Sequence, residues 1–176
     1  VMDVLNDMRD QGKTQFLGLG GTTAYEITHV LDTGRFDVLL SAFNYDLLWR
    51  EAEHSLLPAA KKRQTGVICG SPLHQGALAK AYLDDVVNTP AKWLNPPRRR
   101  QLRRLYELVN DLGMELPELA IRFILSNPDV TTVLTGARTV GELEANVASA
   151  SRGALPDDVL NELKAKPVGF AVFKLL

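Results

Sequence analysis

The sequence is poor in several features that define whole classes of protein. Among its 176 residues there is a single cysteine, Cys69, which excludes an intramolecular disulfide framework and a cysteine-based metal cluster. Lys and Arg (20) nearly balance Asp and Glu (21), so no net field attracts nucleic acid or an anionic membrane. No apolar run approaches the roughly 18–20 residues that span a bilayer. We therefore expect a cytoplasmic protein without a membrane or nucleic-acid partner.

Familiar catalytic and nucleotide-binding motifs are also missing. There is no Gly-x-Gly-x-x-Gly fingerprint, no Walker loop and no Gly-x-Ser-x-Gly nucleophile elbow. The histidines, His29, His54 and His74, are scattered without acidic partners at ligand spacing, which argues against a metal site. The arginine run that begins at Arg98 has no aromatic stacking platform beside it. We interpret it as a solvated helix face rather than a nucleic-acid surface.

What the sequence does contain is a regular alternation of short apolar runs and helical patterns. The runs predict four strands, over residues 16–19 (closed by Gly20 and Gly21), 36–43, 66–70 and 130–134. The first two read as buried, the second on both faces. Helical spacing predicts helices over 1–11, 23–33, 51–63, 98–112, 117–127, 140–150 and 157–164. A stretch interrupted by Pro90, Pro96 and Pro97 follows the third strand.

This alternation predicts an α/β fold with a parallel sheet built from βαβ units. Four strands are half the number in a closed TIM (β/α)8 barrel, which takes about 250 residues. The opening helix begins at Val1 with no capping residue ahead of it. We therefore expect the chain to start in the middle of a longer fold.

In such proteins the loops at the carboxyl ends of the strands carry the ligand site. After the fourth predicted strand, Gly136 and Ala137 are small, and Thr139 with Glu142 forms a capping box. The amides of that helix start, together with Arg138, could bind an anion. The alternative is a plain strand-to-helix turn with a solvent-facing arginine.

The loop after the third strand, Ser71–Gly76, could present amides and a hydroxyl to a phosphate, or could be a turn and nothing more. His74 in this loop could contact a ligand, but a solvated histidine is the simpler interpretation. Cys69 ends an apolar strand and is best explained as a small buried residue.

Four groups of motifs follow one another along the chain, and together they identify a family. They are Gln11-Gly12-Lys13 with Phe16–Leu19, Phe36–Leu39 with Tyr45–Leu48, Gly66–Ile68 with Ser71-Pro72-Leu73 and Gly76, and Leu125–Pro128 with Gly136–Thr139 and Asn146. In order and spacing they resemble the carboxyl-terminal half of the aldo-keto reductases, strands five to eight of a TIM barrel. The resemblance implies that residues 1–176 are one partial domain without its amino-terminal half. Leu39-Leu40-Ser41 and Gly70 look most like the branch that oxidises aldoses such as fucose.

The resemblance implies hydride transfer between NAD or NADP and a small carbonyl or sugar substrate. It assigns pyrophosphate contacts to Ser71 and Leu73. Contacts around the adenosine end fall on the residues after the last strand, which are Gly136, Ala137, Arg138 and Asn146.

Several positions depart from the family pattern. Gly20 and Gly21 replace the Ser-Asn that holds the nicotinamide carboxamide, and Gly70 replaces the aromatic residue that stacks on the ring. The strand-six glutamine is Leu40 or Ser41, depending on the alignment. These changes predict a weak hold on the nicotinamide. Glu142 stands where many members place an arginine for the 2′-phosphate, which favours NAD, although Arg138 could take over the role of that arginine and leave NADP open.

The family's catalytic Asp, Tyr, Lys and His lie on earlier strands, and none of Tyr25, Tyr45, Tyr82 and Tyr106 matches that tyrosine. The resemblance therefore implies no catalytic residue in this chain. One hypothesis is the cofactor-binding half of an oxidoreductase. The other is a truncated or degenerate module that binds a dinucleotide or a partner without turnover. In either case the open strand edges of a half-barrel favour self-association.

Overall fold

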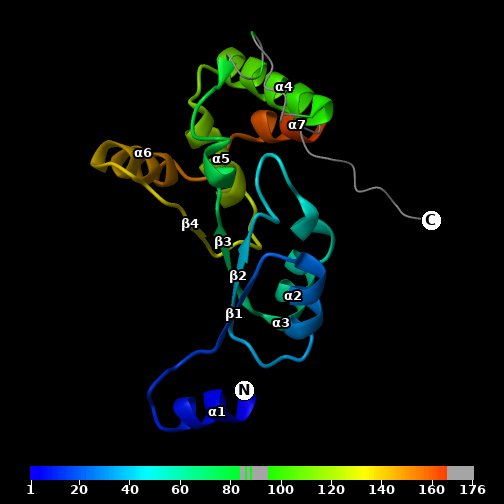
Figure 1. Cartoon of the computed structure of the whole chain (residues 1–176), viewed down its shortest axis with the longest axis vertical. Helices are drawn as coiled ribbons and strands as arrows, with labels where there is room; N and C mark the ends of the chain where they lie inside the picture. The colour runs from blue at the N-terminus through cyan, green and yellow to red at the C-terminus, as the bar shows by residue number, and fades with distance from the viewer. Residues whose placement is uncertain (84–85, 87, 89–94, 166–176) are drawn as a thin grey trace, which may run out of the picture.

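In the computed structural model, which describes residues 1–83, 86, 88 and 95–165, the chain forms an α/β fold on a four-stranded parallel sheet (Figure 1). The strands lie side by side in chain order: β1 (Gly18–Gly21), β2 (Val38–Ala42), β3 (Gly66–Gly70) and β4 (Thr132–Leu134). The predicted α/β class and parallel sheet are confirmed, and the arrangement is consistent with part of a TIM barrel. Pro90, in the predicted break after β3, lies outside the described residues.

The strand register brings all carboxyl ends to one rim. Gly21 pairs with Ser41, Ala42 pairs with Gly70, and Gly70 pairs in turn with Leu134. Loops that follow β2, β3 and β4 therefore leave the sheet on the same side, although they are far apart in the chain.

Helices connect and cover the strands. They are α1 (Met2–Asp10), α2 (Ala24–Leu31), α3 (Leu56–Arg63), α4 (Pro96–Leu112), α5 (Leu116–Leu125), α6 (Val140–Ser151) and α7 (Asp157–Ala165), with 3-10 turns η1 (Glu51–His54) and η2 (His74–Gly76). The single helix predicted over 51–63 is broken at Ser55, whose φ of −140° is not helical. Pro96 and Pro97 open α4 instead of preceding it, because the first helical turn needs no amide donor; Asn95 caps that turn.

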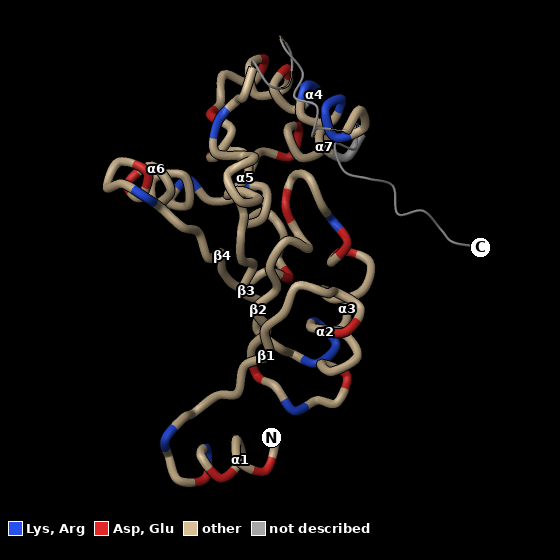
Figure 2. Tube along the Cα trace, in the orientation of Figure 1, with Lys and Arg blue, Asp and Glu red and all other residues tan. Residues whose placement is uncertain are grey.

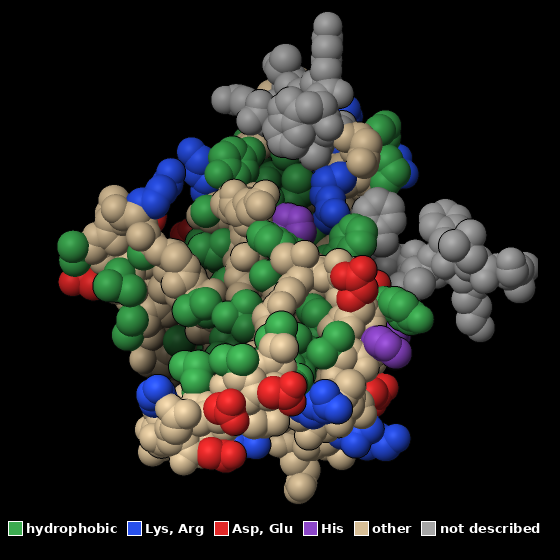
Figure 3. Space-filling model, turned by 60° about the horizontal axis from the view of Figure 1, so that its bottom comes forward, with side chains coloured by type: hydrophobic (Ala, Val, Ile, Leu, Met, Phe, Trp, Pro, Cys, Tyr) green, Lys and Arg blue, Asp and Glu red, His purple; other side chains and the backbone are tan. Residues whose placement is uncertain are grey.

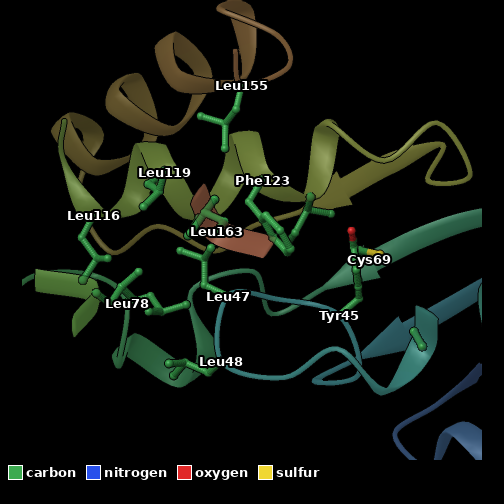
Figure 4. Packing of buried hydrophobic residues seen from close by; sticks show 14 of the residues in the cluster. Tyr45, Leu47, Leu48, Cys69, Leu78, Leu116, Leu119, Phe123, Leu155 and Leu163 are labelled. Atoms are coloured by element: carbon green, nitrogen blue, oxygen red, sulfur yellow. The ribbon is translucent and has the colours of Figure 1, made fainter. Parts of the chain in front are cut away.

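The hydrophobic core lies on one side of the sheet. Leu39, Val67 and Cys69 alternate inward along β2 and β3 and belong to one buried cluster with helical residues such as Leu119 and Phe123. Figure 4 shows Cys69, Leu119 and Phe123 within this cluster. Charged residues keep to the helices and loops, while the strands carry none (Figure 2).

The opposite face of the sheet is only partly covered, so the prediction that the second strand is buried on both faces is wrong. Leu40 and Ile68 on that face are half-buried, and Leu134 is 55% exposed. The first predicted strand also begins later, at Gly18, and is not buried, since Phe16 is exposed and β1 has one strand neighbour in the described residues. Both differences arise because the packed core occupies one side of the sheet.

None of the helices in the described part of the chain combines the length and the apolar character that a membrane span requires.

Candidate functional site

A cleft of about 830 Å³ opens at the carboxyl ends of β3 and β4. Its volume lies within the range of ligand pockets, roughly 300–1,000 Å³. One wall is the Ser71–Gly76 loop with Tyr82, and the other is the β4–α6 loop with the inner face of α6. Glu118 of α5 and Arg152, just after α6, also line the cleft.

The cleft brings together most of the residues predicted around the pyrophosphate and adenosine. Those that line it are Ser71, Leu73, Gly136, Arg138, Glu142 and Asn146. Ala137 lies in the chain between two lining residues but does not itself line the cleft.

The residues predicted around the nicotinamide lie on the same rim but outside the cleft. Ser41 is buried, and its hydroxyl accepts a hydrogen bond from Asn44 Nδ2 at 2.9 Å. Gly70 is also buried. Gly20 and Gly21 end β1, and a Cβ at Gly21 would lie 3.0 Å from Ile27, so this glycine permits close packing of α2.

The partial positive charge at the N-terminus of α6 is partly neutralised by side chains at the start of the helix itself. Thr139 caps the helix by accepting from the Glu142 amide at 3.1 Å, as the predicted capping box requires. The Glu142 carboxylate accepts from the Arg138 amide at 2.7 Å and pairs with its guanidinium at 3.2 Å. These contacts hold the pKa of Glu142 below its usual range. An anion at this helix start therefore faces a carboxylate as well as an arginine.

Two further polar groups shape this wall. A Cβ built on Gly136 would meet nothing within 4 Å, so the missing side chain leaves room for a ligand beside the backbone. Asn146 is buried and donates from Nδ2 to the Gly136 carbonyl at 3.3 Å, which ties the loop to α6.

An ion-pair network that sequence analysis missed supports the back of the cleft. Glu118 is buried; it accepts from Arg122 at 2.8 Å and also pairs with Arg152. Arg122 in turn donates to the carbonyls of Gly153 and Ala154 at 3.1 and 2.9 Å. The network joins α5 to the segment after α6. The i,i+4 spacing of Glu118 and Arg122 is the one sequence signal that pointed to it.

The loop wall is attached to its surroundings by His74 and Tyr82. His74 Nδ1 lies 2.8 Å from the Asp46 carboxylate, so the interpretation of His74 as a solvated residue is wrong. Tyr82 donates from its hydroxyl to the Gly76 carbonyl at 3.0 Å. Asp46 is 28 residues before His74, and no local pattern relates the two.

The arginine run of α4 is not a purely solvated face. Arg98 donates to the Leu48 carbonyl at 3.3 Å and to the Gln101 side chain at 2.6 Å, and its guanidinium lies over the Trp49 ring. Burial lowers the pKa of Arg98. This arginine therefore attaches α4 to the loop after β2.

The cleft presents donors and acceptors together. Hydroxyl, amide and guanidinium groups line it beside open backbone at Gly136, and so do the carboxylates of Glu115, Glu118 and Glu142. Within the described ranges, no group of three or more His, Cys, Asp or Glu side chains is placed to hold a metal ion.

The fold and cleft define a class: an α/β protein with a parallel sheet and a ligand cleft at the carboxyl ends of its strands. The sequence profile of the aldo/keto reductase family matches residues 1–167, and the chain belongs to this family.

Two relatives illustrate the similarity. The chain is 28% identical over 169 residues to L-galactose dehydrogenase of Arabidopsis thaliana. This alignment covers 92% of the chain and 50% of the relative. It is 28% identical over 154 residues to NADH-specific methylglyoxal reductase of Escherichia coli K12, covering 83% of this chain and 47% of the relative. The chain thus spans about half the length of the curated relatives it matches.

Proposed function

We propose that the cleft between the Ser71–Gly76 loop and α6 binds NAD(H) or NADP(H), and that the chain takes part in hydride transfer to or from a small carbonyl or sugar substrate. The cofactor would supply the hydride. The observation that carries this proposal is the convergence, in one cleft, of residues from β3 and β4 that the family resemblance assigns to cofactor contacts. The names of two relatives, L-galactose dehydrogenase and NADH-specific methylglyoxal reductase, support a sugar or a small carbonyl compound as the substrate class.

In this proposal the two walls have separate tasks. Ser71 and Leu73 bind the pyrophosphate. The His74 amide is used within the loop, where it donates to the Ser71 carbonyl at 2.9 Å, so the Ser71 hydroxyl is the side-chain donor proposed for the pyrophosphate. Gly136 and Arg138 contact the adenosine half, and Asn146 holds their loop in place.

We infer a preference for NAD over NADP. The Glu142 carboxylate already pairs with Arg138, and a 2′-phosphate placed beside this pair would meet a negative charge. A ribose hydroxyl could instead donate to the carboxylate. The name of the NADH-specific relative agrees with this preference.

We also propose that residues 1–176 correspond to strands five to eight of a TIM barrel, with β1 as strand five and β4 as strand eight. The half-covered sheet face supports this, because parallel sheets are normally covered on both faces. Hydrophobic side chains gather in the middle of the face seen in Figure 3, with charged groups around its lower rim. The remaining half-barrel, or a second copy of this chain, would cover the half-covered face of the sheet.

The catalytic groups, in this proposal, are supplied from outside the chain. The resemblance aligns none of the tyrosines with the family's catalytic tyrosine. Tyr82 lines the cleft, but its hydroxyl donates to the Gly76 carbonyl at 3.0 Å. Tyr45 is buried, which raises the pKa of its hydroxyl, and it accepts from Asn127.

Binding and turnover test the proposal separately. Titration of the purified chain into NADH and NADPH, followed by cofactor fluorescence, should give saturable binding that is tighter for NADH. The same protein should not reduce an aldehyde such as methylglyoxal. Absence of binding to either cofactor contradicts the proposed site. Turnover by the 176-residue chain contradicts the assignment of catalysis to groups outside it and also excludes the alternative of a non-catalytic module.

A further inference from the structure

His74 is the exception in the loop that forms one wall of the cleft. Ser71, Pro72, Leu73, Gln75 and Gly76 all line the cleft, and His74 does not. Its ring lies instead against two residues that follow β2. Nδ1 is 2.8 Å from Asp46 Oδ2, and the ring meets that of Phe43 edge-on, with centroids 5.8 Å apart. A histidine directed away from the cleft, between neighbours that line it, serves as an anchor and not as a ligand contact.

Asp46 is held in position to accept the hydrogen bond from His74. Its side chain is only 1% exposed, and Oδ1 accepts from the amides of Leu48 and Trp49 at 2.7 and 2.9 Å. These bonds fix the carboxylate within its own loop and leave Oδ2 for His74. Because a carboxylate accepts hydrogen bonds, Nδ1 of His74 carries the proton in this pair.

The backbone of the loop explains why an anchor is needed. Ser71, His74 and Gln75 have φ values of 60°, 46° and 54°, in the left-handed region that residues with a Cβ rarely adopt. Such conformations persist only where the surroundings impose them. The His74–Asp46 bond ties this strained loop, at the middle of its length, to the loop of the neighbouring strand.

We propose that Asp46 and His74 are positioning residues, whose hydrogen bond holds the Ser71–Gly76 loop in the conformation that binds the cofactor pyrophosphate. The inference rests on the proposed cofactor site. Neither side chain touches the cofactor in this arrangement. Loss of the bond lets the loop relax to ordinary backbone angles and weakens binding at Ser71 and Leu73.

Three substitutions at position 74 separate positioning from contact. In His74→Asn the shorter amide can donate from about the place of Nδ1, and asparagine tolerates the left-handed conformation. In His74→Gln the amide lies further out, near the place of Nε2, and His74→Ala removes the donor. The matched control is His29→Ala, which removes an exposed histidine on α2.

The experiment measures NADH affinity by fluorescence for the wild-type chain and the four variants, with circular dichroism and thermal melting as folding checks. We expect His74→Ala and His74→Gln to raise Kd roughly tenfold, the usual effect of one lost charge-assisted hydrogen bond. His74→Asn and His29→Ala should stay within about twofold of wild type. Amide hydrogen exchange in residues 71–78 should rise in the alanine and glutamine variants alone.

Each outcome decides between explanations. If wild type binds neither NADH nor NADPH, the proposed function fails and this inference fails with it. If wild type binds and His74→Gln binds equally well, only the inference is overturned. If His74→Asn binds as weakly as His74→Gln, the imidazole contacts the cofactor directly and positioning is wrong. The asparagine and glutamine variants keep a polar side chain, so their comparison stands even if His74→Ala does not fold.

Discussion

At the scale of single residues, charge and burial at a few positions decide what the cleft can accept. Glu142 and Arg138 illustrate this. Arg138 is 88% exposed and would by itself attract any anion, but its amide and guanidinium both contact the Glu142 carboxylate. The two residues therefore act on a ligand as a unit, and the sign of the local field depends on Glu142.

Replacement of Glu142 by Gln should shift cofactor preference towards NADPH. The substitution keeps the size of the side chain and removes the negative charge that a 2′-phosphate would meet. Because the site is exposed to solvent, we expect a modest change, about two- to fivefold in the ratio of the NADPH and NADH dissociation constants. Fluorescence titrations measure it, with Glu144→Gln as control, an exposed residue of α6 outside the cleft. An unchanged ratio would remove Glu142 from the explanation of cofactor choice.

Cys69 should be inert in the folded chain. It is buried on β3, and burial raises the pKa of its thiol to about 12. The reactive thiolate is therefore scarce at pH 8 in the folded state and far more abundant in the unfolded state. Labelling with iodoacetamide, followed by mass spectrometry, should be at least tenfold slower for the native chain than in denaturing urea. Between pH 7 and pH 9 the labelling rate in urea should rise as the unfolded thiol ionises, while the rate of the native chain should stay low throughout. Equal rates would show that β3 opens readily.

At the scale of elements, packing distances account for residues that resemblance alone makes puzzling. The two glycines that end β1 depart from the family pattern, and the structure gives them different roles. A Cβ at Gly21 would lie 3.0 and 3.1 Å from two carbons of Ile27, whereas a Cβ at Gly20 would approach nothing closer than 4.0 Å. Close contact between α2 and β1 therefore depends on Gly21.

Substitution of these glycines by alanine should separate the two roles. Gly21→Ala forces Ile27, a buried core residue, to move, and we expect it to lower the free energy of unfolding by about 1–3 kcal/mol. Gly20→Ala should leave stability nearly unchanged. Urea denaturation followed by circular dichroism compares them. Equal losses for the two variants would show that α2 is not held as closely as the distances indicate.

At the scale of the whole molecule, the described chain is a sheet with one covered face. Helices bury Leu39 and Val67, and the opposite face leaves Leu40 half-buried and Leu134 mostly exposed. β1 and β4 each have a single strand neighbour within the described residues. Exposed apolar side chains next to unpaired strand edges favour association with another polypeptide.

The purified chain should therefore self-associate as its concentration rises. Leu134→Lys places a charge on β4 at the rim of the sheet and should weaken association, since lysine on an edge strand opposes pairing. Val30→Lys, on the exposed side of α2, is the matched control and should have no effect. Sedimentation velocity measures the distribution. A chain that stays monomeric at all concentrations would contradict a role for the open face in pairing.

The sequence predicted the elements better than the contacts between them. The strand over residues 66–70 and the capping box at Thr139 are confirmed because each depends on neighbouring residues. The pairing of His74 with Asp46 could not be predicted, since it joins two loops that only the register of β2 and β3 brings together. The partly covered face of the sheet was missed for a similar reason. An apolar run in the sequence looks the same whether one face of the strand or both faces are packed.

The pairing of β3 with β4 has a consequence for the order of folding. Cys69 pairs with Val133, so this contact encloses α4 and α5 in a long loop, while β1, β2 and β3 pair across shorter connections. Closing a longer loop costs more chain entropy, and pairing of the three residues of β4 offsets little of that cost. The first three strands should therefore assemble early and the second wall of the cleft last. A ligand that bridges the two walls would then slow unfolding chiefly by delaying the departure of β4 and α6.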